Sequence, residues 1–182
     1  MRIITNFDNQ TVNELFVEVI HRVVYRSYME DDLTFLDLSR LALEDVIDRI
    51  CESVDVTIVS LGEMEHDGEQ VMGGCWFTDD PDSSQAYEWT IGLKAASEAE
   101  IIMALVHEAM HLGQYLTGRL QTIKAHEGYE ECENVWLGQT VSGLNYDEHP
   151  WELEVYGNQE EWLLDMMKDP EFVALLVRCA AG

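Results

Sequence analysis

The sequence predicts an α+β fold, in which a small antiparallel or mixed sheet packs on one central helix and further helices lie near both ends of the chain. Residues 9–25 carry apolar side chains at helical spacing, whereas residues 54–61 alternate and are rich in β-branched types. Residues 97–116 form a longer apolar stretch with the signals of a helix start. With 182 residues, 47% of them hydrophobic, the chain is expected to form a single domain over residues 1–182.

The same patterns predict the remaining elements. The expected order is a second packing helix at 38–51, strands at 71–77 and 86–93, a mixed connector with helical character at 119–133, and a short strand or hairpin at 135–141. Pro150 and Pro170 stand where proline is accepted in the first turn of a helix, which predicts two C-terminal helices. The strand before residues 97–116 is either an exposed edge that pairs with an extended peptide or an ordinary core strand.

Charge and cysteine content exclude several classes of protein. The chain has 36 acidic and 10 basic residues, a net charge of −26, which repels phosphate backbones and anionic lipids. We therefore expect no nucleic-acid partner and no membrane partner. The four cysteines form no CxxC pair, and no apolar run approaches the roughly 20 residues of a membrane span. A cytoplasmic protein with reduced thiols fits these features.

The most informative motif is HExxH, formed by His107, Glu108 and His111. Two histidines four residues apart on a helix project from one side and can hold one Zn²⁺, with the glutamate beside them. Ser97 followed by Glu100 has the spacing of a capping box, which starts a helix at the required place. The alternative is a pair of histidines on an ordinary helix face.

A catalytic zinc site usually has three protein ligands and a water, so a third ligand is needed. The downstream candidates are His126, His149, Glu152 and Glu154. We rank Glu154 first because it shares a helix face with Asn158, one turn later, and because Gly157 beside them allows close approach of a second helix. Glu152 and His149 follow in this ranking, and His126 is last.

HExxH followed by the Glu154, Gly157 and Asn158 group resembles the gluzincin branch of the zincin metallopeptidases. The stretch from Trp136 to Gln159 is similar to that of small predicted peptidases of zincin type, many of them encoded by phages, and the similarity covers about residues 87–162. The resemblance implies a zincin-like fold, zinc on His107, His111 and Glu154, and Glu108 as the general base.

The expected function is therefore zinc-dependent hydrolysis of peptide bonds, with Glu108 taking a proton from water that the metal activates. Tyr146, Tyr156 and His149 are candidates for stabilising the oxyanion, and an acidic surface favours basic or unfolded polypeptide substrates. Two alternatives stay open, namely a zincin-fold protein that binds metal without catalysis and an acidic mimic of nucleic acid. A di-iron site is weaker still, since its second ExxH, Glu63 to His66, lies in a predicted turn.

Overall fold

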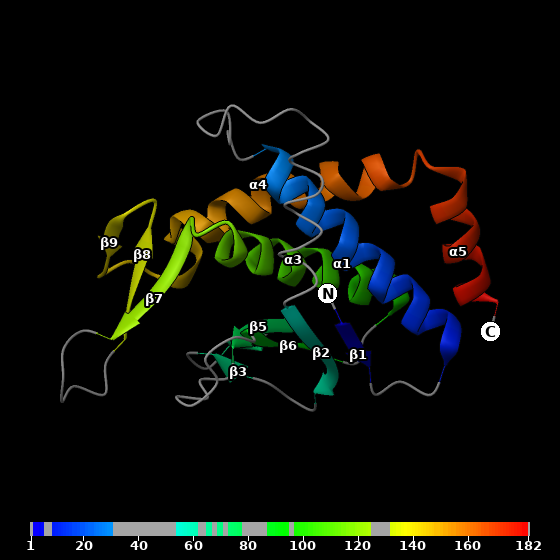
Figure 1. Cartoon of the computed structure of the whole chain (residues 1–182), viewed down its shortest axis with the longest axis horizontal. Coiled ribbons are helices and arrows are strands. Elements are labelled where there is room, and N and C mark those ends of the chain that lie inside the picture. Colours follow the sequence, from blue (N-terminus) through cyan, green and yellow to red (C-terminus); the bar gives the residue numbers. More distant parts are fainter. Residues whose placement is uncertain are drawn as a thin grey trace.

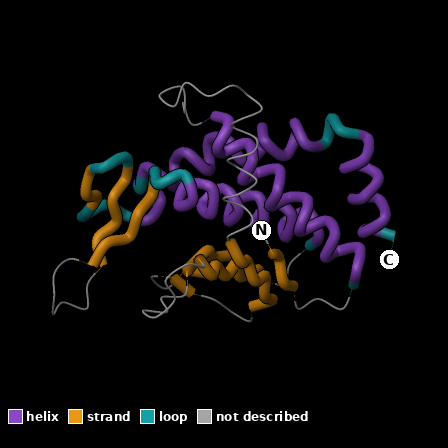
Figure 2. Tube along the Cα trace, viewed as in Figure 1, coloured by secondary structure: helices purple, strands orange, loops and turns teal. Residues whose placement is uncertain are grey.

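A computed structural model describes residues 2–5, 9–30, 54–61, 65–66, 69–70, 73–77, 87–94, 97–124 and 132–181. Within these parts the chain has the expected α+β character, with helices grouped on one side of the main sheet (Figures 1 and 2). The helix predicted at 38–51 lies outside the described residues, as does the candidate ligand His126.

The main sheet is mixed. It contains β1 (Arg2–Thr5), β2 (Val54–Leu61), β6 (Tyr87–Lys94) and β5 (Gly73–Phe77), in the order β1-β2-β6-β5. β1, β2 and β6 are parallel, and β5 is antiparallel to β6. The strand that precedes the HExxH helix, β6, is thus an inner strand, and the interpretation as an exposed edge is wrong. β5 ends the order instead.

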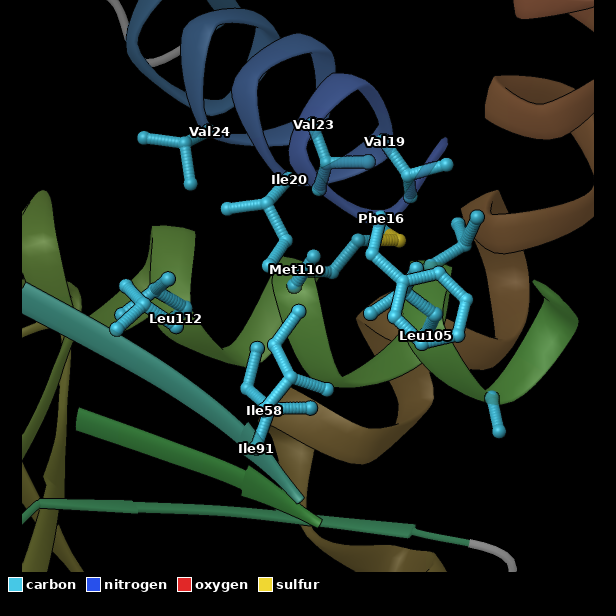
Figure 3. Packing of buried hydrophobic residues seen from close by; sticks show 14 of the residues in the cluster. Phe16, Val19, Ile20, Val23, Val24, Ile58, Ile91, Leu105, Met110 and Leu112 are labelled. Atoms are coloured by element: carbon cyan, nitrogen blue, oxygen red, sulfur yellow. The ribbon is translucent and has the colours of Figure 1, made fainter. Parts of the chain in front are cut away.

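Two helices cross above this sheet. They are α1 (Gln10–Glu30) and α3 (Glu98–Leu116), and α3 carries HExxH. Figure 3 shows α3 between α1 and the strands, with apolar side chains meeting from all three. Phe16 and Ile20 come from α1, Leu105 from α3, and Ile58 and Ile91 from β2 and β6, and all five are buried. Because α3 is covered by α1 on one side and by the sheet on another, its position in the molecule is tightly determined.

The ends of α3 follow the predicted signals. Ser97 is the N-cap, its backbone N–H donates to Glu100 Oε2 at 3.0 Å, and the capping box is complete. At the other end the Thr117 hydroxyl donates to the carbonyl of Gly113 at 2.9 Å, and Gly118 takes a positive φ of 76°. The sequence prediction of this helix is confirmed almost to the residue.

A second sheet occupies residues for which a connector with helical character was expected, and that prediction is wrong. β7 (Leu120–Lys124), β8 (Cys132–Trp136) and β9 (Gln139–Val141) form an antiparallel three-stranded sheet at the end of the molecule far from α5 (Figure 2). The hairpin expected at 135–141 is confirmed, and its two-residue turn places Leu137 and Gly138 at φ of 48° and 79°.

A further short ladder, β3 (Glu65–His66) with β4 (Glu69–Gln70), is antiparallel. His66 therefore lies on a strand, whereas a helical di-iron site needs its ExxH pair on a helix. The di-iron alternative is excluded.

The C-terminal part is helical, as predicted. A 3₁₀ turn (η2, Tyr146–Glu148) leads into α4 (Pro150–Met166), and α5 (Pro170–Ala180) follows, with proline in the first turn of both helices. α4 packs on α3 and α5 packs on α1. Arg22 of α1 contacts Asp169 at 2.6 Å, and Arg26 contacts Asp165 at 2.8 Å, which ties the corner between α4 and α5 to α1. None of the described helices combines the length and the apolar character that crossing a membrane requires.

Candidate metal centre

Three buried side chains from α3 and α4 converge on one point. His107 Nε2 lies 3.1 Å from His111 Nε2, and these two atoms lie 3.3 and 3.2 Å from the two carboxylate oxygens of Glu152. The three residues are 8%, 6% and 2% exposed, so little water reaches these atoms. They form a group that can hold a metal ion.

The donor set fits a cation in both spacing and chemistry. Zinc bound tetrahedrally at about 2.0–2.1 Å has ligand atoms about 3.3–3.4 Å apart, and the separations of 3.1 to 3.3 Å come close to this. Glu152 Oε2 is buried and accepts no well-formed hydrogen bond within the described part of the chain. Such an oxygen is costly to bury unless a positive charge satisfies it.

Each histidine contacts a glutamine side chain through Nδ1, its second ring nitrogen. His111 Nδ1 lies 2.9 Å from Gln114 Oε1, and His107 Nδ1 lies 3.0 Å from Gln159 Oε1. An amide oxygen only accepts, so each contact places a proton on Nδ1 and leaves the lone pair on Nε2, facing the other two ligand atoms. The edge of the Tyr156 ring also meets His107, with ring centres 5.0 Å apart.

Glu154, the third ligand that we ranked first from the sequence, is not part of this group. Its carboxylate forms a two-pronged ion pair with Arg119, at 2.6 and 2.9 Å, and Asn158 donates to its backbone carbonyl at 2.7 Å. Two residues along a helix are about 200° apart, so Glu152 and Glu154 point to different sides of α4. The side that faces the histidines is that of Glu152, our second choice.

The carboxylate of Glu152 is ionised at neutral pH. Burial by itself raises the pKa of Glu152, but its close contacts with His107 and His111, the charge of His111 and the hydroxyl of Tyr146 lower the pKa to about 2. Burial lowers the pKa of His111, but contact with Glu152 and the charge of Glu108 outweigh burial and raise the pKa of His111 above its ordinary value. The group therefore attracts positive charge.

Glu108 lies beside the three converging side chains and is 6% exposed. Burial raises the pKa of Glu108, and the imidazoles of His111 and His107 lower it. Burial is the larger effect, so the pKa of Glu108 lies above its ordinary value. The residue sits tightly against β5, since a Cβ at Gly73 would lie only 2.9 Å from Glu108 Oε1. A buried carboxylate with a raised pKa next to a metal group is a candidate general base.

A pocket of about 220 Å³ opens beside this group. β5, α3, β7, α4 and the turn before α4 supply its walls, which comprise Gly73, Gly74, Cys75, Glu108, His111, Tyr115, Leu120, Tyr146, Trp151 and Glu152. The hydroxyl of Tyr146 bonds to Glu152, and burial, with the nearby negative charge, raises the pKa of Tyr146 far above its usual range. Tyr146 therefore stays protonated, with its one hydroxyl proton directed at Glu152.

His149, the other candidate for stabilising an oxyanion, is oriented differently. Its ring stacks on Trp151, with centres 4.4 Å apart and an angle of 14° between planes, and the edge of the Tyr146 ring faces it at 6.2 Å. It supports the pocket wall rather than lining the pocket described above.

Sequence reasoning missed four residues of this neighbourhood, namely Gln114, Gln159, Arg119 and Gly73. Gln114 could have been found, because it follows His111 by three residues on the same helix, within reach of its ring. Gln159 follows Glu152 by seven residues, two turns along α4 and on the same side, so this spacing could also have marked it. Arg119 and Gly73 come from other parts of the chain, and no spacing marks them. The chain matches no family model, no curated protein and no solved structure.

Proposed function

We propose that this protein is a zinc-dependent metallopeptidase. The observation that carries the proposal is the convergence of His107, His111 and Glu152 with Glu108 beside them, at the wall of a pocket. Structural zinc sites are closed by four protein ligands, whereas catalytic ones have three and keep a position for water or substrate. Within the described residues the group offers three ligands.

The chain's own side chains have separate roles in this chemistry. Bound zinc would supply a Lewis acid that acidifies water and polarises a carbonyl group. Glu108 takes the proton from the attacking water and passes it to the leaving amine, a role for which its raised pKa suits it. Tyr146 keeps its proton and, once its hydroxyl turns away from Glu152, donates a hydrogen bond to the oxygen that gains negative charge.

β5 supports a polypeptide as the substrate. One side of this strand pairs with β6, no described strand lies on its other side, and Gly73, Gly74 and Cys75 line the pocket. An extended peptide can add to such an edge through backbone hydrogen bonds, which would hold a peptide bond near the metal group. The net charge of −26 favours basic or unfolded chains.

The proposal is tested with metal analysis and a hydrolysis assay on the same preparations. We expect about one zinc per chain in untreated protein, and cleavage of fluorescently labelled β-casein, an unfolded substrate, that a chelator abolishes and zinc restores. Glu108→Gln should keep the zinc and lose at least about a hundredfold in kcat/KM, within the range for general bases. His107→Ala should lose both zinc and activity.

Three results would contradict the proposal in different ways. Zinc binding without cleavage would leave a protein that binds metal in a structural or interaction role. Equal cleavage by the Glu108→Gln variant would refute Glu108 as the general base. Tight, salt-sensitive binding to a DNA-binding protein that a chelator does not affect would favour the nucleic-acid mimic.

A further inference from the structure

Behind His111, on the side away from the metal group, a line of polar side chains leads to the second sheet. Gln114 stands at its centre and is 1% exposed. Its Oε1 contacts His111 Nδ1, and its Nε2 donates to the carbonyl of Trp151 at 3.1 Å and to Glu154 Oε2 at 2.7 Å. All the hydrogen bonds of this buried amide are thus made within α3 and α4.

These contacts determine which way the amide of Gln114 points. The carbonyl of Trp151 and the carboxylate of Glu154 are both acceptors, so the NH₂ group must face them. The amide oxygen is then left facing His111, and its acceptor character requires a proton on Nδ1 of that ring. Glu154 and the carbonyl of Trp151 together therefore determine, through Gln114, that the Nε2 lone pair of His111 faces the metal group.

Glu154 is itself immobilised. The guanidinium of Arg119, just before β7, donates hydrogen bonds to both carboxylate oxygens of Glu154. Its central carbon lies 5.6 Å from the centre of the Trp136 ring on β8. The side chains of Arg119 and Glu154 are only 19% and 28% exposed. A two-pronged pair between partly buried groups holds its geometry better than an exposed ion pair does.

We propose that Arg119, Glu154 and Gln114 form a positioning relay that fixes the tautomer and the ring orientation of His111 for metal binding. The inference deepens the proposed function and rests on the metal group of that site. It assigns to Glu154 a role in metal binding that acts through two hydrogen bonds rather than through a metal–oxygen bond. Partners of this kind typically account for 10- to 100-fold in metal affinity.

The first test measures zinc affinity by competition with a chromophoric chelator, without any substrate. Gln114→Ala should weaken zinc binding about 10- to 100-fold, because Nδ1 of His111 loses its acceptor. Gln114→Glu should also weaken it, since a carboxylate oxygen then faces Glu154 Oε2 at the present 2.7 Å. Gln139→Ala, at an exposed glutamine of β9, is the control and should bind zinc as the wild type does.

A double variant separates a relay from a merely structural role. Combining Gln114→Glu with Glu154→Gln exchanges the carboxylate and the amide and leaves the net charge unchanged. A donor again stands between positions 114 and 154, and an acceptor again faces Nδ1, whereas the carbonyl of Trp151 stays without its donor. Zinc affinity should therefore recover in part and exceed that of the Gln114→Glu single variant. No recovery, with thermal stability of the metal-free variants close to wild type, would overturn the relay.

The tautomer can be read without metal. In ¹⁵N-labelled metal-free wild-type protein at alkaline pH, side-chain ¹H–¹⁵N correlation spectra should show the His111 proton on Nδ1. In the Gln114→Ala variant a large fraction of the molecules should carry that proton on Nε2 instead. An Nε2–H tautomer in the wild type would overturn the relay. Because neither test involves hydrolysis, a protein that cleaves nothing would refute the peptidase and leave the relay to be judged on these measurements.

Discussion

The crossing of α1 and α3 depends on the absence of a side chain at Gly113. A Cβ there would lie 2.1 Å from Ser27 Oγ and 2.7 Å from Ser27 Cβ, well inside the 3.4 Å of ordinary contact. The Ser27 hydroxyl, which donates to the carbonyl of Val23 at 3.0 Å, can rotate about χ1, but the Ser27 Cβ is bonded to the backbone of α1 and cannot move without moving that helix. Gly113→Ala must therefore push α1 and α3 apart.

The size of the effect follows from two opposing terms. Overpacking a well-packed core costs about 1–3 kcal/mol, and removing glycine from a helix interior returns about 0.5–1 kcal/mol. We expect Gly113→Ala to lower the free energy of unfolding by about 1–2 kcal/mol. The loss should lie near the upper end of this expected range, because the clash involves Ser27 Cβ, which is bonded to the backbone of α1. Gly157→Ala on α4, where a Cβ meets nothing within 4 Å, should instead be neutral or stabilising.

Urea unfolding in the presence of a chelator measures both variants without interference from metal. The midpoint should fall for Gly113→Ala at an unchanged slope and should not fall for Gly157→Ala. In double-mutant cycles, which cancel the cost of glycine in α1, Ser27→Gly should relieve more of the Gly113→Ala loss than Ser27→Ala, since only the glycine removes the Cβ at 2.7 Å. Equal stability of Gly113→Ala and the wild type would refute the close crossing of the two helices.

Three further predictions concern the site. Glu152→Ala should abolish stoichiometric zinc binding, whereas Glu154→Gln should retain it with lower affinity, and metal analysis after dialysis would show the reverse if Glu154 were the ligand. Gly73→Ala should keep zinc and lower kcat/KM roughly 10- to 100-fold, because its Cβ would displace the Glu108 carboxylate; unchanged turnover on labelled β-casein would contradict the tight contact with β5. The pKa of Glu108 is higher in the folded protein than in the unfolded chain. Protonation of Glu108 therefore contributes stability that is fully present below its pKa in the unfolded chain and is lost as the pH rises through its pKa in the folded protein. Glu108→Gln should therefore raise the melting temperature of metal-free protein at neutral pH, and this gain should shrink on acidification below the ordinary range of glutamate; a constant or negative difference would show that burial does not dominate.

The local part of the structure was predictable from local signals. Ser97 with Glu100 located the start of α3, and Pro150 and Pro170 located the starts of α4 and α5, because caps and first-turn prolines act within a few residues of the chain. HExxH likewise identified two of the three converging side chains, since a spacing of four residues on a helix is enough to bring both imidazoles to one side.

The third member of the group depends on how α4 is turned about its own axis. Spacing shows that Glu154 and Asn158 share a face, but which face turns towards α3 is decided by burial of Trp151 and Val155 on one side of α4. Glu152, next to Trp151, follows that side inward. Such a rotation is set by packing between distant elements, so no pattern within α4 alone reveals it.

The misread strands have a similar cause. Residues 120–124 become β7 because residues 132–136 pair with them, and β6 becomes an inner strand because β5 adds to its far side. Pairing between segments is decided by tertiary contacts, which override the weak preference of a short stretch for helix or strand. Among the described strands, the order places β5 at the edge of the main sheet that lines the pocket.

The burial of two carboxylates at one place is the feature that most needs a physical cause. Glu108 and Glu152 are 6% and 2% exposed, and each is close enough to affect the other, since the charge of Glu152 raises the pKa of Glu108. In a chain of net charge −26, nearby cationic side chains are scarce, and burying such charges without a partner costs several kcal/mol. Two Nε2 lone pairs beside them add to the negative potential. A divalent cation would offset all of these groups at once, and this is the physical reason for proposing a metal where a strongly acidic protein holds a histidine pair and two carboxylates beneath the pocket.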